Sequence, residues 1–156
     1  MSKKAFTLIE LLIVIVILGV LAALITGNFF TSLKKGRDAK RKADLEQIQR
    51  ALELYYEDKK AYPLTTASIF GSALSDPVSG KVYMQKVPDD PISGKDYEYL
   101  STDGTDYKLF ACLENNLQIL PYESTGSNLA CGNCRNPGDT ADVECILGIS
   151  SSNISP

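Results

Sequence analysis

Residues 6–33, FTLIELLIVIVILGVLAALITGNFFTSL, decide the fold, because this stretch carries a single charged residue, Glu10. All of the residues from 11 to 33 are uncharged. A helix rises about 1.5 Å per residue, so about 20 apolar residues cross the roughly 30 Å hydrocarbon layer of a membrane. The segment from Leu11 to Phe30 therefore predicts a membrane-spanning helix.

A secretory signal peptide is the alternative interpretation of this stretch. Such a signal has an apolar region of about 7 to 15 residues followed by a small-residue cleavage site, which Ala22-Ala23 imitates only weakly. The apolar run here is longer, and a cleaved export signal gives Glu10 no role. A carboxylate in a membrane helix is costly and marks a functional site. We therefore favour a retained helix in which Glu10 has a partner.

Residues 3–12, KKAFTLIELL, closely resemble the type III signal of type IV pilins and type II secretion pseudopilins. In that family a peptidase on the cytoplasmic face of the membrane cuts before the Phe and methylates the new amino group. The resemblance implies cleavage between Ala5 and Phe6 and N-methylation of Phe6. It also implies that the Glu10 carboxylate meets the amino-terminal ammonium of a neighbouring subunit during assembly, each charge offsetting the desolvation of the other.

Two positions depart from the pattern of this family. Ala5 stands where Gly is usual before the cut, which adds one methyl group and keeps the site small. Gly27 stands where Pro is frequent, and the Gly27-Asn28 pair either softens the helix or is merely tolerated in it.

The run after the apolar segment, KKGRDAKRK at 34–42, holds six basic residues and is predicted to meet anionic lipid headgroups. Only Lys3 and Lys4 precede the segment, so the positive-inside rule alone would leave the rest of the chain in the cytoplasm. The leader, however, must face the cytoplasm to be cut, and the clustered cysteines suit an oxidising exterior. We therefore expect a precursor in the bacterial cytoplasmic membrane with its head outside, and later a cell-surface filament.

The helix is expected to continue to about Lys59, giving a length of about 50 residues, and Pro63 lies beyond its end. Its second half shows one apolar stripe at spacings of four and three: Arg41, Leu45, Ile48, Leu52 and Tyr55. The oppositely charged pairs Asp38 with Lys42 and Glu46 with Arg50 are expected to be solvated support on an exposed face.

The head is predicted to be a small antiparallel sheet. Asp76-Pro-Val-Ser-Gly-Lys-Val-Tyr83 is nearly repeated at residues 90–97, and each copy has turn chemistry that leads into a strand, at about 81–87 and 96–101. In residues 107–113 every second residue, Tyr107, Leu109, Ala111 and Leu113, falls on one face, and Asp103-Gly104 supplies a hairpin turn before them. Residues 90–99 also resemble, more weakly, the head of major pseudopilins. The tail from Gly148 to Pro156 is expected to be frayed.

Four cysteines lie in this region, at Cys112, Cys131, Cys134 and Cys145, and allow three disulfide pairings. A zinc site is the alternative, although structural Cys₄ sites usually show two paired knuckles. A thioredoxin-type role for Cys131 and Cys134 is weaker, because no βαβ pattern surrounds them.

A calcium site and solvated turn carboxylates are the two interpretations of the acidic residues in the head, and we favour the second. Calcium needs several oxygen ligands but no EF-hand spacing is present. The acidic residues concerned are Asp96, Asp103, Asp106 and Glu114. We expect no metal ligand and no cofactor.

The sequence thus predicts an α+β protein in four parts: a cleaved leader at 1–5, the spanning and assembly half of the helix at 6–33, its amphipathic half at 34–60, and a β head at 61–156. The resemblance implies a structural subunit of a type IV pilus or a secretion pseudopilus, and leaves open which. Its implied partners are identical or homologous subunits, the prepilin peptidase, the inner-membrane assembly platform and, before assembly, membrane lipid. The alternative is a solitary membrane-anchored protein that does not polymerise.

Two other classes are disfavoured. The chain has no His, no nucleophile motif and no phosphate-cradling Gly loop, so nothing indicates an enzyme. The formal net charge of −3 lacks the broadly basic character of a nucleic-acid binder.

Overall fold

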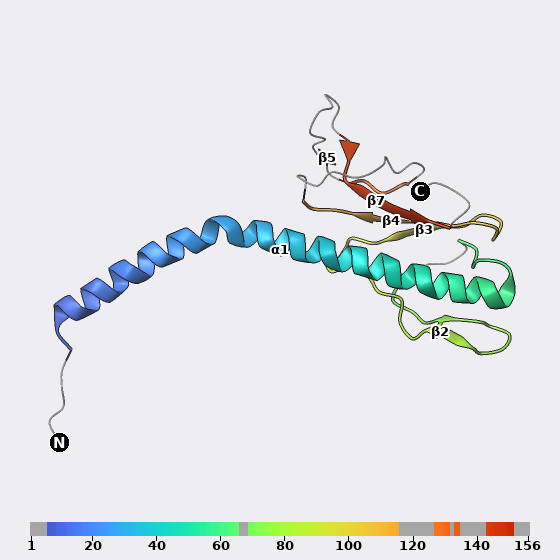
Figure 1. Ribbon diagram of the computed structural model, residues 1–156, viewed down its shortest axis with the longest axis horizontal. Coiled ribbons are helices and arrows are strands. Elements are labelled where there is room, and N and C mark those ends of the chain that lie inside the picture. Colours follow the sequence, from blue (N-terminus) through green and yellow to red (C-terminus); the bar gives the residue numbers. More distant parts are fainter. Residues whose placement is uncertain (1–5, 66–68, 116–126, 132, 135–142, 152–156) are drawn as a thin grey trace, which may run out of the picture. The chain divides into compact units, whose positions relative to one another are not determined.

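The computed structural model describes residues 6–65, 69–115, 127–131, 133–134 and 143–151, and the side chains of 26–28, 133–134 and 143–144 lie outside this description. The chain divides into two compact units, residues 1–34 and 35–156. A single helix, α1 (Leu8–Lys59, 52 residues), runs through both (Figure 1). This confirms the prediction of one helix of about 50 residues.

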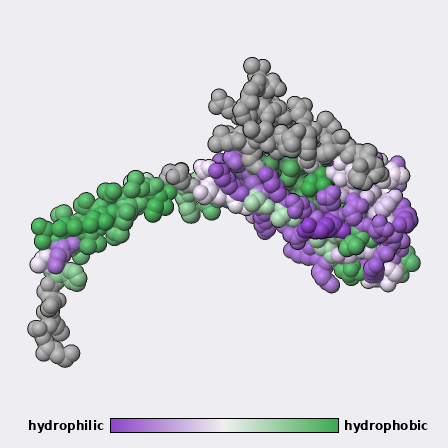
Figure 2. All heavy atoms as spheres, in the orientation of Figure 1, coloured by the Kyte–Doolittle hydropathy of each residue, from purple (hydrophilic) through white to green (hydrophobic). Residues whose placement is uncertain are grey.

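The N-terminal unit contains the apolar half of α1. Within the described residues, Leu8–Ile25 is the one helical stretch that is long and apolar enough to cross a membrane, with a mean hydropathy of 3.2. None of its residues is buried within the chain, and Figure 2 shows the hydrophobic surface that results. This surface needs lipid or other helices around it.

The C-terminal end of α1 is capped by a lysine in the left-handed conformation rather than by a glycine. Lys60 adopts a φ of 55°, and its N–H donates to the carbonyl of Tyr56 at 2.7 Å. This left-handed residue satisfies one of the last carbonyls of the helix. Pro63 follows three residues later, beyond the end of the helix as expected.

Among its described residues, the head contains three small antiparallel sheets. The largest has the strand order β3-β4-β7, formed by β3 (Glu98–Leu100), β4 (Lys108–Cys112) and β7 (Ile146–Ser150). The first two strands to appear in the chain, β1 (Leu74–Ser75) and β2 (Val82–Met84), pair with each other. The last pair is β5 (Asn133–Cys134) with β6 (Val143–Glu144). The predicted antiparallel sheet is confirmed.

The repeated Asp-Pro segments form turns that lead into strands, as predicted, although β2 and β3 are shorter than expected. Gly80 and Gly94 hold the same place in the two copies and have φ of 71° and 82°. In the first copy the Asp76 carboxylate accepts the N–H of Val78 at 3.0 Å. In the second, Asp90 accepts the N–H of Ile92 at 2.8 Å. The first copy leads into β2 and the second into β3.

The expectation of a frayed tail from Gly148 is wrong for its first residues. Gly148 and Ser150 lie in β7, where they pair with Phe110 and Lys108 of β4. The physical reason is that β3 pairs with only one edge of β4. The backbone N–H and C=O groups on the other edge of β4 need hydrogen-bond partners, and β7 supplies them. Residues 152–156 lie outside the described part of the chain.

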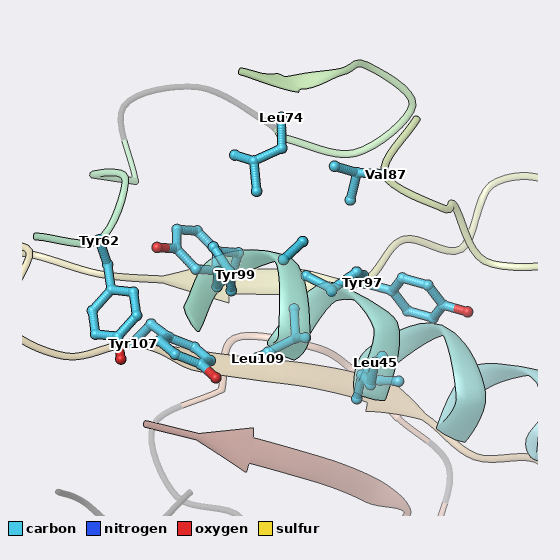
Figure 3. Packing of buried hydrophobic residues seen from close by; sticks show 12 residues of the cluster. Leu45, Tyr62, Leu74, Val87, Tyr97, Tyr99, Tyr107 and Leu109 are labelled. Carbon is cyan, nitrogen blue, oxygen red and sulfur yellow. The ribbon is translucent and has the colours of Figure 1, made fainter. Parts of the chain in front are cut away.

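The core of the head lies between α1 and the β3-β4-β7 sheet (Figure 3). The predicted apolar stripe of α1 supplies Leu45, Ile48 and Leu52, all fully buried. Tyrosine rings fill much of the remaining space, and the rings of Tyr62 and Tyr107 meet edge to face at 4.7 Å. Their packing adds ring–ring interactions of about 0.5 to 1.5 kcal/mol each to the burial of apolar area.

Replacing Gly104 with alanine is expected to destabilise the head by about 1 to 3 kcal/mol. Gly104 lies in the hairpin between β3 and β4 with a φ of 78°, and an added Cβ would lie 3.1 Å from the backbone oxygen of Tyr62. Gly80→Ala is the matched control, because its φ of 71° is equally strained but its surroundings are open. Chemical denaturation should show the larger loss for Gly104→Ala, and equal losses would contradict the steric part of the argument.

Candidate functional site

The amino-terminal end of α1 is closed by a reciprocal cap between Thr7 and Glu10. The Glu10 Oε2 accepts the backbone N–H of Thr7 at 2.9 Å and its hydroxyl at 2.8 Å. In return the Thr7 hydroxyl accepts the N–H of Glu10 at 3.4 Å. This arrangement is a capping box, which fixes where the helix starts. Phe6 therefore lies outside the helix, with 85% of its surface exposed.

The Glu10 carboxylate retains capacity for a further partner. Both contacts from Thr7 reach Oε2, and Oε1 accepts no hydrogen bond from the described residues. An ionised carboxylate accepts several hydrogen bonds, and the remaining oxygen can receive an ammonium group from outside the chain. The structure thus places Phe6 and Glu10 at one exposed end of the apolar helix, and Ala5 lies outside the described residues.

A second polar centre lies in the head around Arg41, which is fully buried. Its guanidinium forms a two-pronged contact with Asp90, with Nε to Oδ2 at 2.6 Å and Nη2 to Oδ1 at 2.9 Å. The Nη1 atom donates to Asp38 at 2.8 Å and to Glu114 at 2.7 Å. Three carboxylates therefore surround one arginine, and each stabilises it in a region from which water is excluded.

Asp38 and Glu114 extend this centre to the end of β4. Asp38 also accepts the backbone N–H groups of Glu114 at 2.9 Å and Asn115 at 2.8 Å. Glu114 also receives Arg37, with Nη2 to Oε2 at 2.6 Å. We call these five side chains the arginine centre: Arg37, Asp38, Arg41, Asp90 and Glu114. It joins α1, the second Asp-Pro turn and the end of β4 within the head.

Two expectations from the sequence are corrected by this centre. Asp38 is buried and bonded to Arg41 and to the backbone after β4, so it is not solvated support on an exposed face. Arg37 and Arg41 point to carboxylates, so two of the six basic residues in the run at 34–42 are engaged within the head. The signal was present in the sequence, because a charged residue at a position of the apolar stripe, Arg41, is buried only when it is paired.

The stability of the head is expected to fall in acid between about pH 4.5 and about pH 2. The hydrogen bonds from Arg37, aided by those from Arg41 and opposed by desolvation, lower the pKa of Glu114 to about 2. A carboxyl group with a lowered folded pKa contributes stability above its unfolded pKa and loses it as the pH falls through the folded value. The contribution of Glu114 is about 3 kcal/mol at most.

Denaturation of the full chain in detergent at several pH values checks this expectation. Glu114→Gln should be less stable than wild type at neutral pH and should show a shallower decline in acid. A variant with an unchanged decline would show that other carboxylates control the acid response. Asp76 is one such group, since the hydrogen bond from Lys59 lowers its pKa.

The aspartate of each Asp-Pro turn forms an ion pair with a basic residue of α1. Asp76 receives Lys59 Nζ at 2.6 Å, as Asp90 receives Arg41. The two basic residues are 18 positions apart, which is five turns of an α-helix, so they lie on the same side of α1. The sequence repeat predicted the turns, but it did not predict that each aspartate also pairs with a basic residue of α1.

Three of the four cysteines, Cys112, Cys131 and Cys145, are described with their side chains and form disulfides. Cys112 at the end of β4 is bonded to Cys131, and Cys145 is also disulfide-bonded. Two of the three pairings left open by the sequence are thereby excluded, and the side chain of Cys134 lies outside the described residues. A disulfide sulfur lacks the thiolate charge that binds Zn²⁺, which favours the disulfide interpretation of Cys112 and Cys131 over the zinc one.

The acidic residues considered for calcium do not converge. Glu114 belongs to the arginine centre, and Asp103 accepts the N–H and hydroxyl of Thr105. Asp96 is exposed and Asp106 is half-buried. Across the described part of the chain, no group of three or more His, Cys, Asp or Glu side chains is arranged to hold a metal ion.

The leader, the capped apolar helix and the small β head define a prepilin-type protein. In agreement, residues 1–26 match the model for the prokaryotic N-terminal methylation motif. Residues 28–116 match the model for protein G of the type II secretion system (T2SS), and the chain belongs to this family. The match resolves the choice between pilus and secretion machinery that the sequence alone left open. Cys131, Cys134 and Cys145 lie beyond the matched residues.

Several curated relatives carry the name type II secretion system core protein G. The protein from Vibrio cholerae is 32% identical over 107 residues, which are 64% of this chain and 72% of the relative. The protein from Klebsiella pneumoniae is 35% identical over 108 residues, 64% of this chain and 75% of the relative. The protein from Pseudomonas aeruginosa is 34% identical over 109 residues, with the same two shares. No solved structure matches the chain.

Proposed function

We propose that this chain is a structural subunit of the type II secretion pseudopilus, inserted as a precursor and polymerised through the apolar half of α1. The observation that carries the proposal is an unburied apolar helix, Leu8–Ile25, that holds one carboxylate at its capped end. The family membership supports the same role. A filament core in which such helices pack together buries this surface away from water.

Processing is proposed to occur at the bond between Ala5 and Phe6, followed by methylation of the Phe6 amino group by the prepilin peptidase. The match to the methylation motif supports this step. The geometry also suits it, because the capping box starts α1 at Leu8 and leaves Phe6 outside the helix. A bond outside a helix is accessible to a peptidase without local unfolding.

After processing, the ammonium group of Phe6 is proposed to pair with Glu10 of a neighbouring subunit. Each of these charges is costly in an apolar environment when alone, and pairing offsets the two desolvation penalties. The unused Oε1 of Glu10 is the acceptor that this pairing needs. The pair therefore gives the apolar helices a fixed register, which uniform hydrophobic contact does not provide.

The head is proposed to lie outside the cytoplasmic membrane. The disulfide between Cys112 and Cys131 supports this placement, because disulfides persist in oxidising compartments and are rare in the cytosol. The partners in this scheme are other pseudopilins, the prepilin peptidase and the assembly platform in the inner membrane. The role is structural and requires no reaction centre, metal or cofactor.

A solitary membrane anchor is the second candidate, favoured by the same apolar helix. Expression of the chain together with its secretion machinery separates the two functions. Shearing should release the chain in high-molecular-mass filaments, detected by immunoblot and electron microscopy. A chain that stays wholly in the membrane fraction, while a known pseudopilin in the same cells is released, would favour the solitary anchor.

A further inference from the structure

Three exposed lysines follow the apolar segment directly and lack an anionic partner within the described chain. We name Lys34, Lys35 and Lys40 the membrane-proximal lysines. None of them has an ion pair or hydrogen bond with a described residue. They differ in this from the neighbouring Arg37 and Arg41, which are held by the arginine centre.

The carboxylates best placed to neutralise these lysines are turned inward. Asp38 lies four residues after Lys34 and is buried against Arg41 and the backbone after β4. Asp44 lies four residues after Lys40 and is buried with the Tyr97 hydroxyl at 2.9 Å. Spacings of three and four are those at which helical ion pairs form, and Asp38 also lies three residues after Lys35. The fold thus removes the local acids and leaves positive charge on the surface.

The position of these lysines along α1 indicates which anion they meet. The predicted membrane-spanning segment ends at Phe30. Lys34 follows Phe30 by four residues, which is a rise of about 6 Å along the helix axis. The headgroup layer on each side of a bilayer is about 5 to 8 Å thick. Lys34 and Lys35 therefore reach lipid phosphates directly, whereas Lys40, about 15 Å beyond Phe30, acts through the surface potential within about one Debye length.

We infer that the membrane-proximal lysines bind the phosphate groups of anionic phospholipids in the leaflet that faces the head. Each lysine near an anionic surface strengthens binding by about five-fold. Five of the six basic residues thus fall into two groups, since Arg37 and Arg41 hold the head together and the membrane-proximal lysines hold the subunit to lipid. The inference rests on the membrane-inserted stage of the proposed function.

The test reconstitutes the full chain into vesicles of phosphatidylcholine alone and into vesicles with about 30% phosphatidylglycerol, an anionic lipid. A membrane-impermeant amine-reactive reagent labels the lysines, and mass spectrometry reads each position. The expected result is a several-fold slower labelling of Lys34, Lys35 and Lys40 in the anionic vesicles, reversed by about 1 M salt. Lys86 and Lys95 are exposed lysines of the head and serve as internal controls whose labelling should not change.

Three outcomes would overturn the inference: equal labelling in both vesicle types, an equal decrease at Lys86 and Lys95, or protection by inorganic phosphate added to neutral vesicles. The last would indicate a site for free anions rather than a lipid contact. Flotation with the vesicles is measured first, because a chain that does not insert contradicts the proposed function instead.

Discussion

Glu10→Leu is expected to leave the protein inserted in the membrane but to reduce its incorporation into filaments by about ten-fold or more. The substitution makes the helix more apolar, so insertion is retained. It removes the proposed partner of the Phe6 ammonium, and an unpaired charge in an apolar interface costs several kcal/mol, well above the roughly 1.4 kcal/mol that corresponds to ten-fold. The measurement compares the chain in sheared filaments with the chain in the membrane fraction.

A second substitution separates the charge of Glu10 from its role in the capping box. Glu10→Gln keeps an oxygen that accepts the Thr7 N–H but removes the charge. We expect it to retain the helix start and still to assemble poorly. Glu46→Gln is the matched control, because Glu46 is an exposed residue of the same helix outside the apolar segment. Normal filament yield from Glu10→Gln would show that helix capping, rather than charge pairing, is the role of Glu10.

Arg41→Met is expected to destabilise the head by about 3 to 5 kcal/mol, because it leaves the buried carboxylates of Asp38 and Asp90 without their cation. Methionine fills much of the same volume, so the loss reports the charge rather than a cavity. Chemical denaturation of the full chain in detergent, followed by the circular dichroism of the head tyrosines, measures the change in the free energy of unfolding.

Two further variants are compared with Arg41→Met in the same denaturation experiment. Arg50→Met removes an exposed arginine from the same helix and should change the stability by less than about 0.5 kcal/mol. Arg41→Lys keeps the charge but cannot reproduce the two-pronged contact with Asp90, so an intermediate loss is expected. Equal stability of Arg41→Met and Arg50→Met would show that the arginine centre contributes nothing to the fold.

Local rules predicted the elements of this fold well where one strong pattern controlled each segment. The apolar run and the stripe that contains Leu45, Ile48 and Leu52 depend on periodicity, and α1 follows both. The turns at Gly80 and Gly94 depend on short-range chemistry, and both glycines have the positive φ that the sequence implied. The proposed functional residues Phe6 and Glu10 come from a short contiguous motif, which is why the sequence could name them.

Long-range partners were the part that the sequence could not supply. Glu114 lies 73 residues from Arg41 and Asp90 lies 49 from it, so no local spacing connects them. The pairing of β7 with β4 likewise depends on the edge that β4 presents after folding, and Gly148 and Ser150 carry little strand propensity of their own. Arg41 was the one local sign of the centre, as a charged residue on an apolar stripe.

The intact mass of the chain in sheared filaments, compared between cells with and without the prepilin peptidase, tests whether the chain is a processed filament subunit. With the peptidase, we expect a chain that begins at Phe6 and is heavier by one methyl group. Without it, we expect a chain that begins at Met1 and stays in the membrane. A filament subunit that begins at Met1, or a chain that never enters filaments, would show that processing before Phe6 and polymerisation are not the role of this protein.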